Sequence, residues 1–167
     1  MRKLSFLAFA CVILAAFASI PTPRVAGADP ANEAPAVVWT DDYAAALAQA
    51  KKDGKMLMLD FTGSDWCGYC IKLHNQVFSK PEFATWANAK FILVELDFPA
   101  KKKLDDKVKQ QNAALNKKYA IKGYPTIIVL DSDEKELTRA VGYGGDKPEA
   151  WMKKIDDGIA AGKAKNQ

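Results

Sequence analysis

The 167-residue sequence predicts an α/β protein whose mixed central sheet has helices on both faces. Three observations support this class. Short, nearly unbroken apolar runs recur along the chain, as in strands that are covered on both faces. Amphipathic helical patterns separate these runs, and a short turn joins the last two. From the first apolar run onward, the order is therefore strand, helix, strand, helix, strand, strand and helix.

A first helix is predicted to precede the first strand. Thr40 or Asp41 can cap its start, lysines 51 and 52 occupy its last turn, and Gly54 stands just beyond its end. Residues 56–61 then form the first buried strand, because all but one of them are apolar.

The next helix is predicted to begin at Cys67, since the apolar residues after it recur at helical spacing. They are Cys70, Leu73 and Val77. Pro81 can open another short helix, because proline is tolerated in the first helical turn. Residues 91–96 repeat the pattern of a buried strand.

Apolar residues at helical spacing between positions 104 and 119 indicate a further helix, and residues 126–130 form the third buried strand. A turn at 131–133 leads into an antiparallel strand at 137–142. Pro148 stands near the start of the last helix. The apolar stripe of that helix consists of Trp151, Ile155 and Ile159.

Residues 1–28 are predicted to be an export signal. Two basic residues open it, an uncharged and mostly apolar stretch covers positions 4–20, and Ala26-Gly27-Ala28 has the form of a cleavage site. Ala16-Phe17-Ala18 offers a second site of that form. The alternative is an uncleaved membrane anchor, because the apolar stretch reaches the lower limit of about 17–25 residues for a span. In both cases the remaining chain lies outside the cytoplasm, and we expect it in the periplasm.

Without the signal, the chain is long enough for one domain with an adequate core. We assign residues 29–36, rich in alanine and proline, to a flexible tether, 37–162 to the domain and 163–167 to a C-terminal tail. The formal charge of +4 falls to +1, because the signal contains three bases and no acid. This balance does not indicate a nucleic-acid partner. Lysines 101–103 form the only basic run, which predicts a solvated loop or helix start.

Removal of the signal also removes Cys11 and leaves Cys67 and Cys70 as the only cysteines. A sulfur at the start of a helix lies over unpaired backbone N–H groups, which favour the thiolate, so Cys67 is the predicted nucleophile. Cys70, one helical turn later, could attack a mixed disulfide formed on Cys67. The pair is therefore predicted to be a redox-active disulfide.

Two other roles for the cysteine pair are less favoured. A structural bridge across so short a loop would add little to the free energy of unfolding. A zinc site needs about four ligands, whereas the sequence has one histidine and no second cysteine pair. We therefore expect no metal and no cofactor.

From about Val37 to Ala161 the chain resembles the thioredoxin superfamily, and in particular its small exported bacterial members. The segments that carry the likeness are Asp60-Phe61, Trp66 to Cys70, Tyr119 to Thr126 and Val141-Gly142. The resemblance implies a thioredoxin fold. It also implies that Pro125 is cis and lies against the sulfurs, so that the backbone of Tyr124 can pair with an extended substrate. An ordinary turn is the alternative at this position.

The resemblance places Asp60 at a buried carboxylate that moves protons to and from Cys70. Glu95 stands where many relatives have a lysine, and two close carboxylates do not both ionise readily. We hypothesise that one of them keeps its proton at neutral pH and relays it to Cys70. The alternative is that each lies half-exposed at a strand end.

Trp66, Gly68 and Tyr69 are the expected substrate contacts within the motif, since an exposed aromatic ring offers an apolar surface to a client chain. His74 has the spacing to share a helix face with Cys70 but is more readily explained as a solvated residue.

Together these features predict an exported thiol-disulfide oxidoreductase that reduces or isomerises protein disulfides. Its expected partners are extracytoplasmic proteins with disulfides and a periplasmic or membrane electron donor, and it contacts the membrane only if the signal is retained. A reductase dedicated to one client, such as apocytochrome in c-type cytochrome maturation, is one alternative. A non-catalytic binding or chaperone module is the other.

Overall fold

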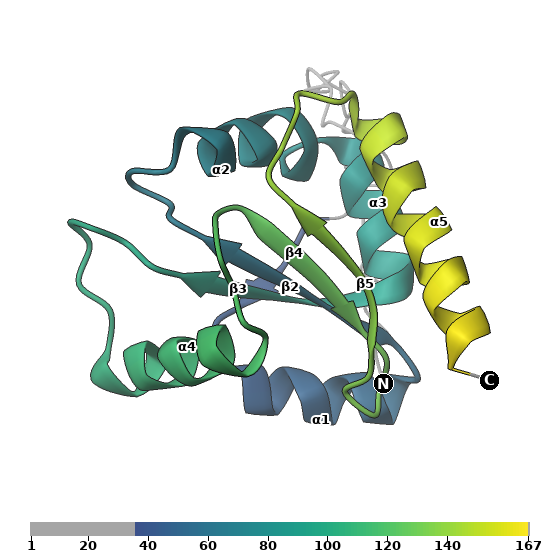
Figure 1. The fold of residues 1–167 in the computed structure, drawn as a ribbon, viewed down its shortest axis with the longest axis horizontal. Coiled ribbons are helices and arrows are strands. Elements are labelled where there is room, and N and C mark those ends of the chain that lie inside the picture. Colours follow the sequence, from purple (N-terminus) through teal and green to yellow (C-terminus); the bar gives the residue numbers. More distant parts are fainter. Residues whose placement is uncertain (1–35, 167) are drawn as a thin grey trace, which may run out of the picture. The chain divides into compact units, whose positions relative to one another are not determined.

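The computed structural model describes residues 36–166 (Figure 1). The predicted export signal, both possible cleavage sites and residues 29–35 of the predicted tether lie outside this range. Within it, no helix combines the length and the apolar content that crossing a membrane requires.

The predicted mixed sheet is confirmed and has five strands in the order β1-β3-β2-β4-β5. Their bounds are Trp39–Thr40 (β1), Met56–Thr62 (β2), Phe91–Asp97 (β3), Thr126–Leu130 (β4) and Glu136–Val141 (β5). β1, β2 and β3 are parallel, whereas β4 is antiparallel to β2 and to β5. Four strands lie within one residue of their predicted bounds. β1 was not predicted, because two residues are too few to show a strand periodicity.

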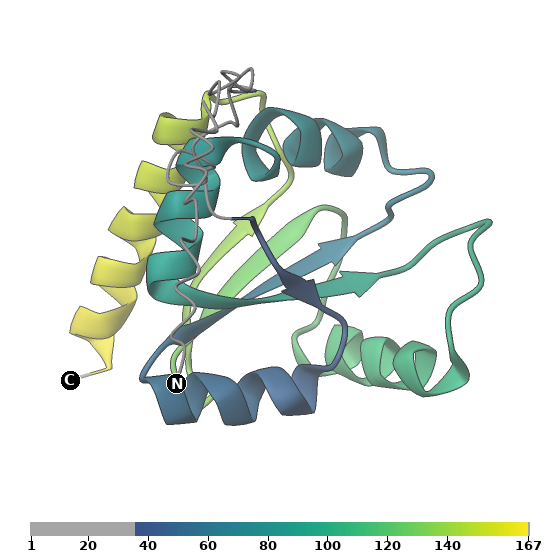
Figure 2. The same ribbon diagram turned by 180° about the vertical axis from the view of Figure 1, so that it is seen from behind.

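Helices cover both faces of the sheet, as predicted (Figures 1 and 2). They are α1 (Tyr43–Asp53), α2 (Gly68–Leu73), α3 (Pro81–Lys90), α4 (Asp106–Lys118) and α5 (Pro148–Lys165). A short π-helical turn, η2 (His74–Phe78), continues α2. Side chains alternate along β2, so Leu57 and Leu59 pack with α1 and α4, whereas Met58 packs with η2, α3 and α5.

Three helix ends differ from the prediction. The cap of α1 is Asp42, whose carboxylate accepts a hydrogen bond from the backbone N–H of Ala45 at 3.0 Å. α4 begins at Asp106, which leaves Leu104 in the preceding loop. α5 continues to Lys165, into the segment predicted as a tail. Such shifts arise because residues near a helix end can adopt either conformation, and tertiary contacts decide between them.

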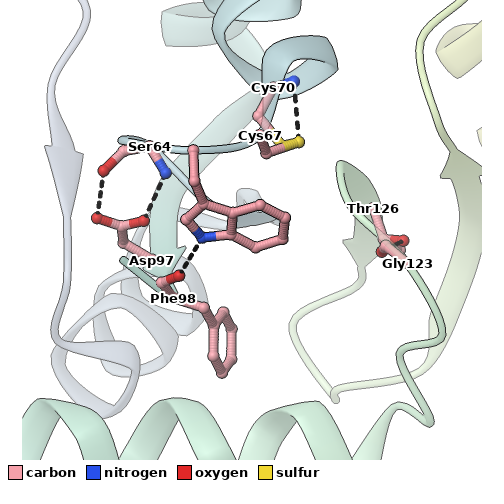
Figure 3. The surroundings of a disulfide bond; sticks show 8 residues. Ser64, Cys67, Cys70, Asp97, Phe98, Gly123 and Thr126 are labelled. Carbon is pink, nitrogen blue, oxygen red and sulfur yellow. Dashed lines mark hydrogen bonds between the residues drawn. A yellow bond between two sulfur atoms is a disulfide. The ribbon is translucent and has the colours of Figure 1, made fainter. Parts of the chain in front are cut away.

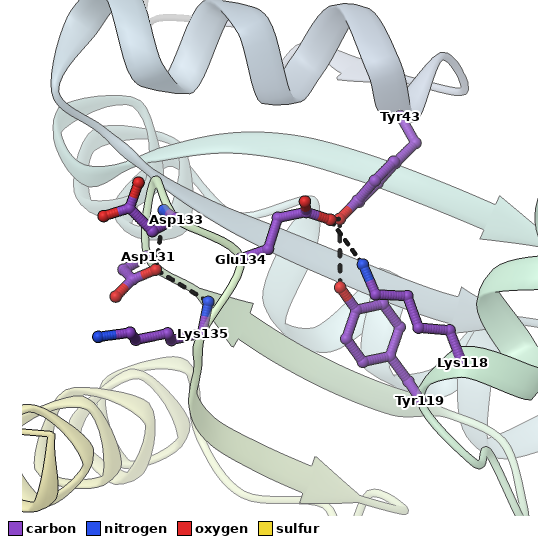
Figure 4. Close-up of polar contacts among 7 residues, drawn as sticks. All are labelled: Tyr43, Lys118, Tyr119, Asp131, Asp133, Glu134 and Lys135. Carbon is purple, nitrogen blue, oxygen red and sulfur yellow. Dashed lines mark hydrogen bonds and ion pairs between the residues drawn. The ribbon is translucent and has the colours of Figure 1, made fainter.

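A polar network joins α1 and the end of α4 to the turn between β4 and β5 (Figure 4). The Tyr43 hydroxyl donates to Glu134 at 2.6 Å and lies 3.1 Å from the Tyr119 hydroxyl. The same Glu134 oxygen accepts a hydrogen bond from Lys118 at 2.6 Å. Burial and the bond to Glu134 raise the pKa of Tyr43. The network fastens the end of the sheet that lies away from the cysteines.

α5 approaches β5 closely at two glycines. A Cβ atom at Gly158 would overlap the Thr138 side chain, and one at Gly162 would overlap the backbone carbonyl of Leu137. Because a backbone carbonyl cannot rotate away as a side chain can, Gly162 is the more demanding position.

We expect Gly162→Ala to lower the free energy of unfolding by about 1–3 kcal/mol, because the added methyl group overpacks the contact with β5. The loss should appear despite the roughly 1 kcal/mol that alanine gains over glycine inside a helix. Urea denaturation measures the change. Gly144→Ala is the matched control, since a Cβ there meets no atom within 4 Å. Equal free energies of unfolding for the two variants would contradict the close approach of α5 to β5 at Gly162.

Candidate active site

Cys67 and Cys70 form a disulfide at the start of α2, with 5.2 Å between their Cα atoms (Figure 3). Cys67 is the N-cap residue of this helix, as predicted. Its Sγ accepts a hydrogen bond from the backbone N–H of Cys70 at 3.2 Å. Both residues are largely covered, with exposed fractions of 7% and 4%. The sulfur of Cys67 therefore faces an N–H donor that would stabilise a negative charge on it.

The turn that leads into the motif is fixed by Gly63. Its carbonyl accepts hydrogen bonds from the backbone N–H groups of Trp66, at 3.2 Å, and of Cys67, at 2.8 Å. A Cβ atom at Gly63 would overlap the Trp66 indole. The indole therefore packs directly against the backbone here, and its Nε1 donates to the carbonyl of Phe98 at 2.7 Å. The ring is held in place and still half exposed.

The Tyr124-Pro125 peptide bond is cis, as the resemblance implied. The carbonyl of Pro125 accepts a hydrogen bond from the backbone N–H of Gly142 at 2.8 Å. The Thr126 hydroxyl donates a hydrogen bond to the carbonyl of Gly123 at 2.8 Å. The Tyr124 ring meets the Trp66 ring edge to face, with centroids 5.7 Å apart. This contact brings the proline loop and the cysteine motif together.

A pocket of about 300 Å³ lies beside Cys70 and contains both predicted carboxylates. Asp60 and Glu95 are direct neighbours across β2 and β3. Asp60 is only 6% exposed, and its Oδ1 has no hydrogen-bond partner among the described residues. The half-exposed alternative is therefore wrong for Asp60, whereas Glu95 is half-buried. His74, exposed as expected, also lines this pocket.

The pKa values of both carboxyl groups are shifted upward. Burial, followed by the charges of Glu95 and Asp97, raises the pKa of Asp60 well above its ordinary value. Burial and Asp97 also raise the pKa of Glu95, while the positive charges of Lys102 and His74 oppose that rise. A carboxyl group that holds its proton at higher pH than usual therefore stands next to Cys70.

Three polar neighbours of the cysteine turn were not predicted. Asp97, 5% exposed, accepts hydrogen bonds from the backbone N–H and the hydroxyl of Ser64 at 2.9 and 2.6 Å. Asp65 accepts from the backbone N–H groups of residues 100–102. Ser64 belongs to the turn between β2 and Cys67. These partners lie more than 30 positions apart in the sequence, so no local pattern reveals them.

Among the predicted substrate contacts, Trp66 is 50% and Tyr69 is 65% exposed, and Gly68 is also exposed. Tyr124 is half-buried, whereas Pro125 is buried. The structure thus places the aromatic residues on an open surface around the disulfide.

Comparison with known proteins finds matches over most of the chain. A family model described as a thioredoxin-like domain matches residues 43–158. The chain is 34% identical over 119 residues to the disulfide bond reductase DsbH of Chlamydia pneumoniae, covering 71% of each protein. It is 33% identical to the thioredoxin-related protein DsbJ of the same organism, but spans only 33% of that protein's length. A solved structure of a DsbH oxidoreductase has a TM-score of 0.71 at 32% identity, with 84% of this chain and 95% of that chain covered.

We expect Asp60→Asn to raise the free energy of unfolding of the oxidised protein at pH 7. Because its pKa is raised in the folded state, Asp60 favours folding most at low pH, and this contribution is lost as pH rises from about 4 through the folded-state pKa. Asp60→Asn lacks this loss, so the difference between its free energy of unfolding and that of the unaltered protein should grow from about pH 4 to about pH 8. Urea denaturation at several pH values measures it. The control is Asp133→Asn, an exposed carboxyl-to-amide change. A pH-independent difference between Asp60→Asn and the unaltered protein would contradict the assignment.

Proposed function

The chain belongs to the thioredoxin-like family, and on that basis we propose that it is an exported thiol-disulfide oxidoreductase that reduces or isomerises protein disulfides. The observation that carries this proposal is the disulfide between Cys67 and Cys70 at the start of α2. It lies beside a cis proline loop and a buried carboxyl group, and both cysteines belong to a Cys-x-x-Cys motif with an exposed aromatic border.

In the reducing direction, the Cys67 thiolate attacks one sulfur of a client disulfide, and the other client sulfur leaves as a thiolate that takes up a proton. Cys70 then attacks the sulfur of Cys67 in the mixed disulfide. The client leaves as a dithiol that has gained two electrons, and the cysteine pair, having lost two, becomes the disulfide seen in the structure. A dithiol donor in the periplasm or the membrane would restore the reduced pair.

Cys67 is the proposed nucleophile because of its place at the helix start. The N–H of Cys70 points at its sulfur, and hydrogen bonding to a thiolate lowers the pKa of a cysteine. Cys70 is the more deeply covered of the two and lines the carboxyl pocket, which suits a resolving residue.

Asp60 and Glu95 are the proposed proton relay for Cys70. They share the pocket with its sulfur, and neighbouring carboxylates in such a site do not both ionise readily. We therefore assign one proton to this pair at neutral pH. The proton leaves the Cys70 thiol through the pair when Cys70 attacks, and returns by the same route on reduction.

The proposed client-binding surface consists of Trp66, Gly68, Tyr69 and the Tyr124-Pro125 loop. Among the described residues, no backbone group bonds to the N–H or the carbonyl of Tyr124, so both can pair with an extended chain. The exposed rings of Trp66 and Tyr69, which belong to the cysteine motif, offer apolar contact to a client chain.

We expect Cys70→Ala to accumulate mixed disulfides with exported proteins that contain cysteines, because the resolving thiol is absent while the nucleophile remains. The complexes are detected by non-reducing electrophoresis and mass spectrometry after expression of the full chain. The mass of the recovered protein shows in addition whether the chain is cut before Asp29. Cys67→Ala is the matched control and should trap nothing.

The range of trapped proteins distinguishes the possible functions. Many partners support a general reductase or isomerase, whereas a single partner supports a client-specific reductase. If Cys70→Ala traps no partner and the reduced protein fails to reduce insulin, the chain is a binding module and the proposal is wrong.

We expect Asp60→Ala and Glu95→Gln each to slow the resolving step at pH 7, by about tenfold to 100-fold for Asp60→Ala, because the carboxyl pair through which the Cys70 proton leaves is then incomplete. Stopped-flow measurement of a preformed mixed disulfide follows this step. The difference should narrow as pH rises and Cys70 ionises without help. Asp133→Asn serves as the control, and unchanged rates in both pocket variants would show that the carboxyl pair does not relay protons.

A further inference from the structure

The loop between β3 and α4, residues 98–105, is fastened to the turn that precedes Cys67. Three successive residues of that turn make the contacts. Ser64 bonds to Asp97 at the end of β3, and the Trp66 indole donates to the carbonyl of Phe98. Between them, the Asp65 carboxylate accepts from three consecutive backbone N–H groups, those of residues 100, 101 and 102, at 2.8, 2.7 and 3.0 Å.

Both segments project from the same end of the sheet, as Figures 1 and 2 show from opposite sides. The rings of Phe98 and Tyr124 are 5.4 Å apart, and Tyr124 also contacts Trp66. The loop therefore extends the aromatic surface that borders the disulfide. Without these hydrogen bonds, the loop at residues 98–105 would sample many conformations. The bonds to Asp65 hold its backbone in one conformation.

The loop carries Lys101, Lys102 and Lys103, all of them exposed. None of the three takes part in an ion pair with another residue in the range 36–166. The acids that contact the loop or directly follow it are engaged elsewhere. Asp106 forms an ion pair with Lys109 at 3.9 Å. Asp65 binds the loop backbone, and Asp105 caps α4 by accepting from the N–H of Lys107 at 2.8 Å. The three ammonium groups are thus available to a partner.

The positive charge of this loop extends to the reactive site. The positive charge of Lys102 opposes the rise in the pKa of Glu95, which shares the pocket with Cys70. Lys102 also lines a second pocket of about 200 Å³, together with Lys109, Asn112, the buried Asp97 and the apolar side chains of Phe98, Pro99 and Leu104. The two lysines at this pocket suit a carboxylate on an otherwise apolar chain segment, because Asp97 already accepts hydrogen bonds from Ser64.

We propose that the loop at 98–105, held by Asp65, recognises acidic residues that flank the disulfide of a client protein. The inference rests on the proposed function and specifies its preferred substrate: a protein segment in which glutamate or aspartate neighbours the cysteine that Cys67 attacks. A cluster of positive charge on a loop that is bonded to the turn before Cys67 raises the rate of productive encounters with such segments.

Two synthetic peptides test the proposal. Each contains one intramolecular disulfide, and they differ only at four flanking positions, which are glutamate in one and glutamine in the other. The pre-reduced full chain is mixed with each peptide, and peptide thiols are trapped and counted over time. We expect the glutamate peptide to react about tenfold faster at low ionic strength, and the ratio of the two rates to approach one in about 0.5 M salt.

Three variants locate the origin of this ratio. Replacement of Lys101, Lys102 and Lys103 by glutamine should abolish the preference. The matched control replaces three exposed lysines at the ends of α1 and α5, namely Lys51, Lys52 and Lys165, and should keep it. Asp65→Ala retains all three loop lysines and makes the chain one charge more positive, yet should also lose the preference because the loop is released.

The outcomes separate the inference from the proposed function. Equal rates with the two peptides in the unaltered chain overturn the inference alone. The inference is also overturned if the control variant loses as much of the rate ratio between the two peptides as the loop variant does. A higher rate ratio in Asp65→Ala overturns it as well. In both cases the total charge of the chain, and not the position of the loop, would be responsible for the preference. Failure to reduce either peptide overturns the proposed function and the inference together.

Discussion

The site depends on the tight turn between β2 and α2. The carbonyl of Gly63 accepts hydrogen bonds from Trp66 and Cys67, and this pairing makes Cys67 the residue at which helical conformation begins. The absence of a side chain at Gly63 lets the indole of Trp66 pack against the backbone. One turn thus decides both where the sulfur meets the helix N–H groups and where the principal aromatic surface lies.

The buried carboxyl group shows a conflict between stability and chemistry. Asp60 lies in the central strand of the sheet, and its Oδ1 is the one buried side-chain polar atom without a partner in the described range. Burial without a partner is unfavourable for a charged group, so the group tends to stay protonated. A protein tolerates such a group where a proton is needed, and here the group shares a pocket with Cys70.

Around the cysteine turn, the acidic groups lie inside the protein and the basic groups lie on its surface. β3 brings Glu95 and Asp97 close to Asp60, and the loop that follows presents the three lysines to solvent. Contacts from Ser64, Asp65 and Trp66 join that loop to the cysteine turn. The turn therefore links the acidic pocket, the disulfide and the basic surface into one structural unit.

The sequence alone determined four of the five strands and the presence of the main helices. The strand at 126–130 and the helix at Pro148, for example, are marked by local periodicity and by proline chemistry. It also indicated that Cys67 begins a helix, and the resemblance to the thioredoxin superfamily implied that Asp60 and Glu95 lie together. Only the tertiary structure decided the short edge strand β1, the burial of Asp60 and the contacts of Asp97 and Asp65. The contacts of Asp97 and Asp65 join residues more than 30 positions apart, and β1 is too short to show a period. The burial of Asp60 depends on the elements that pack around the central strand, so none of these features leaves a periodic signal along the chain.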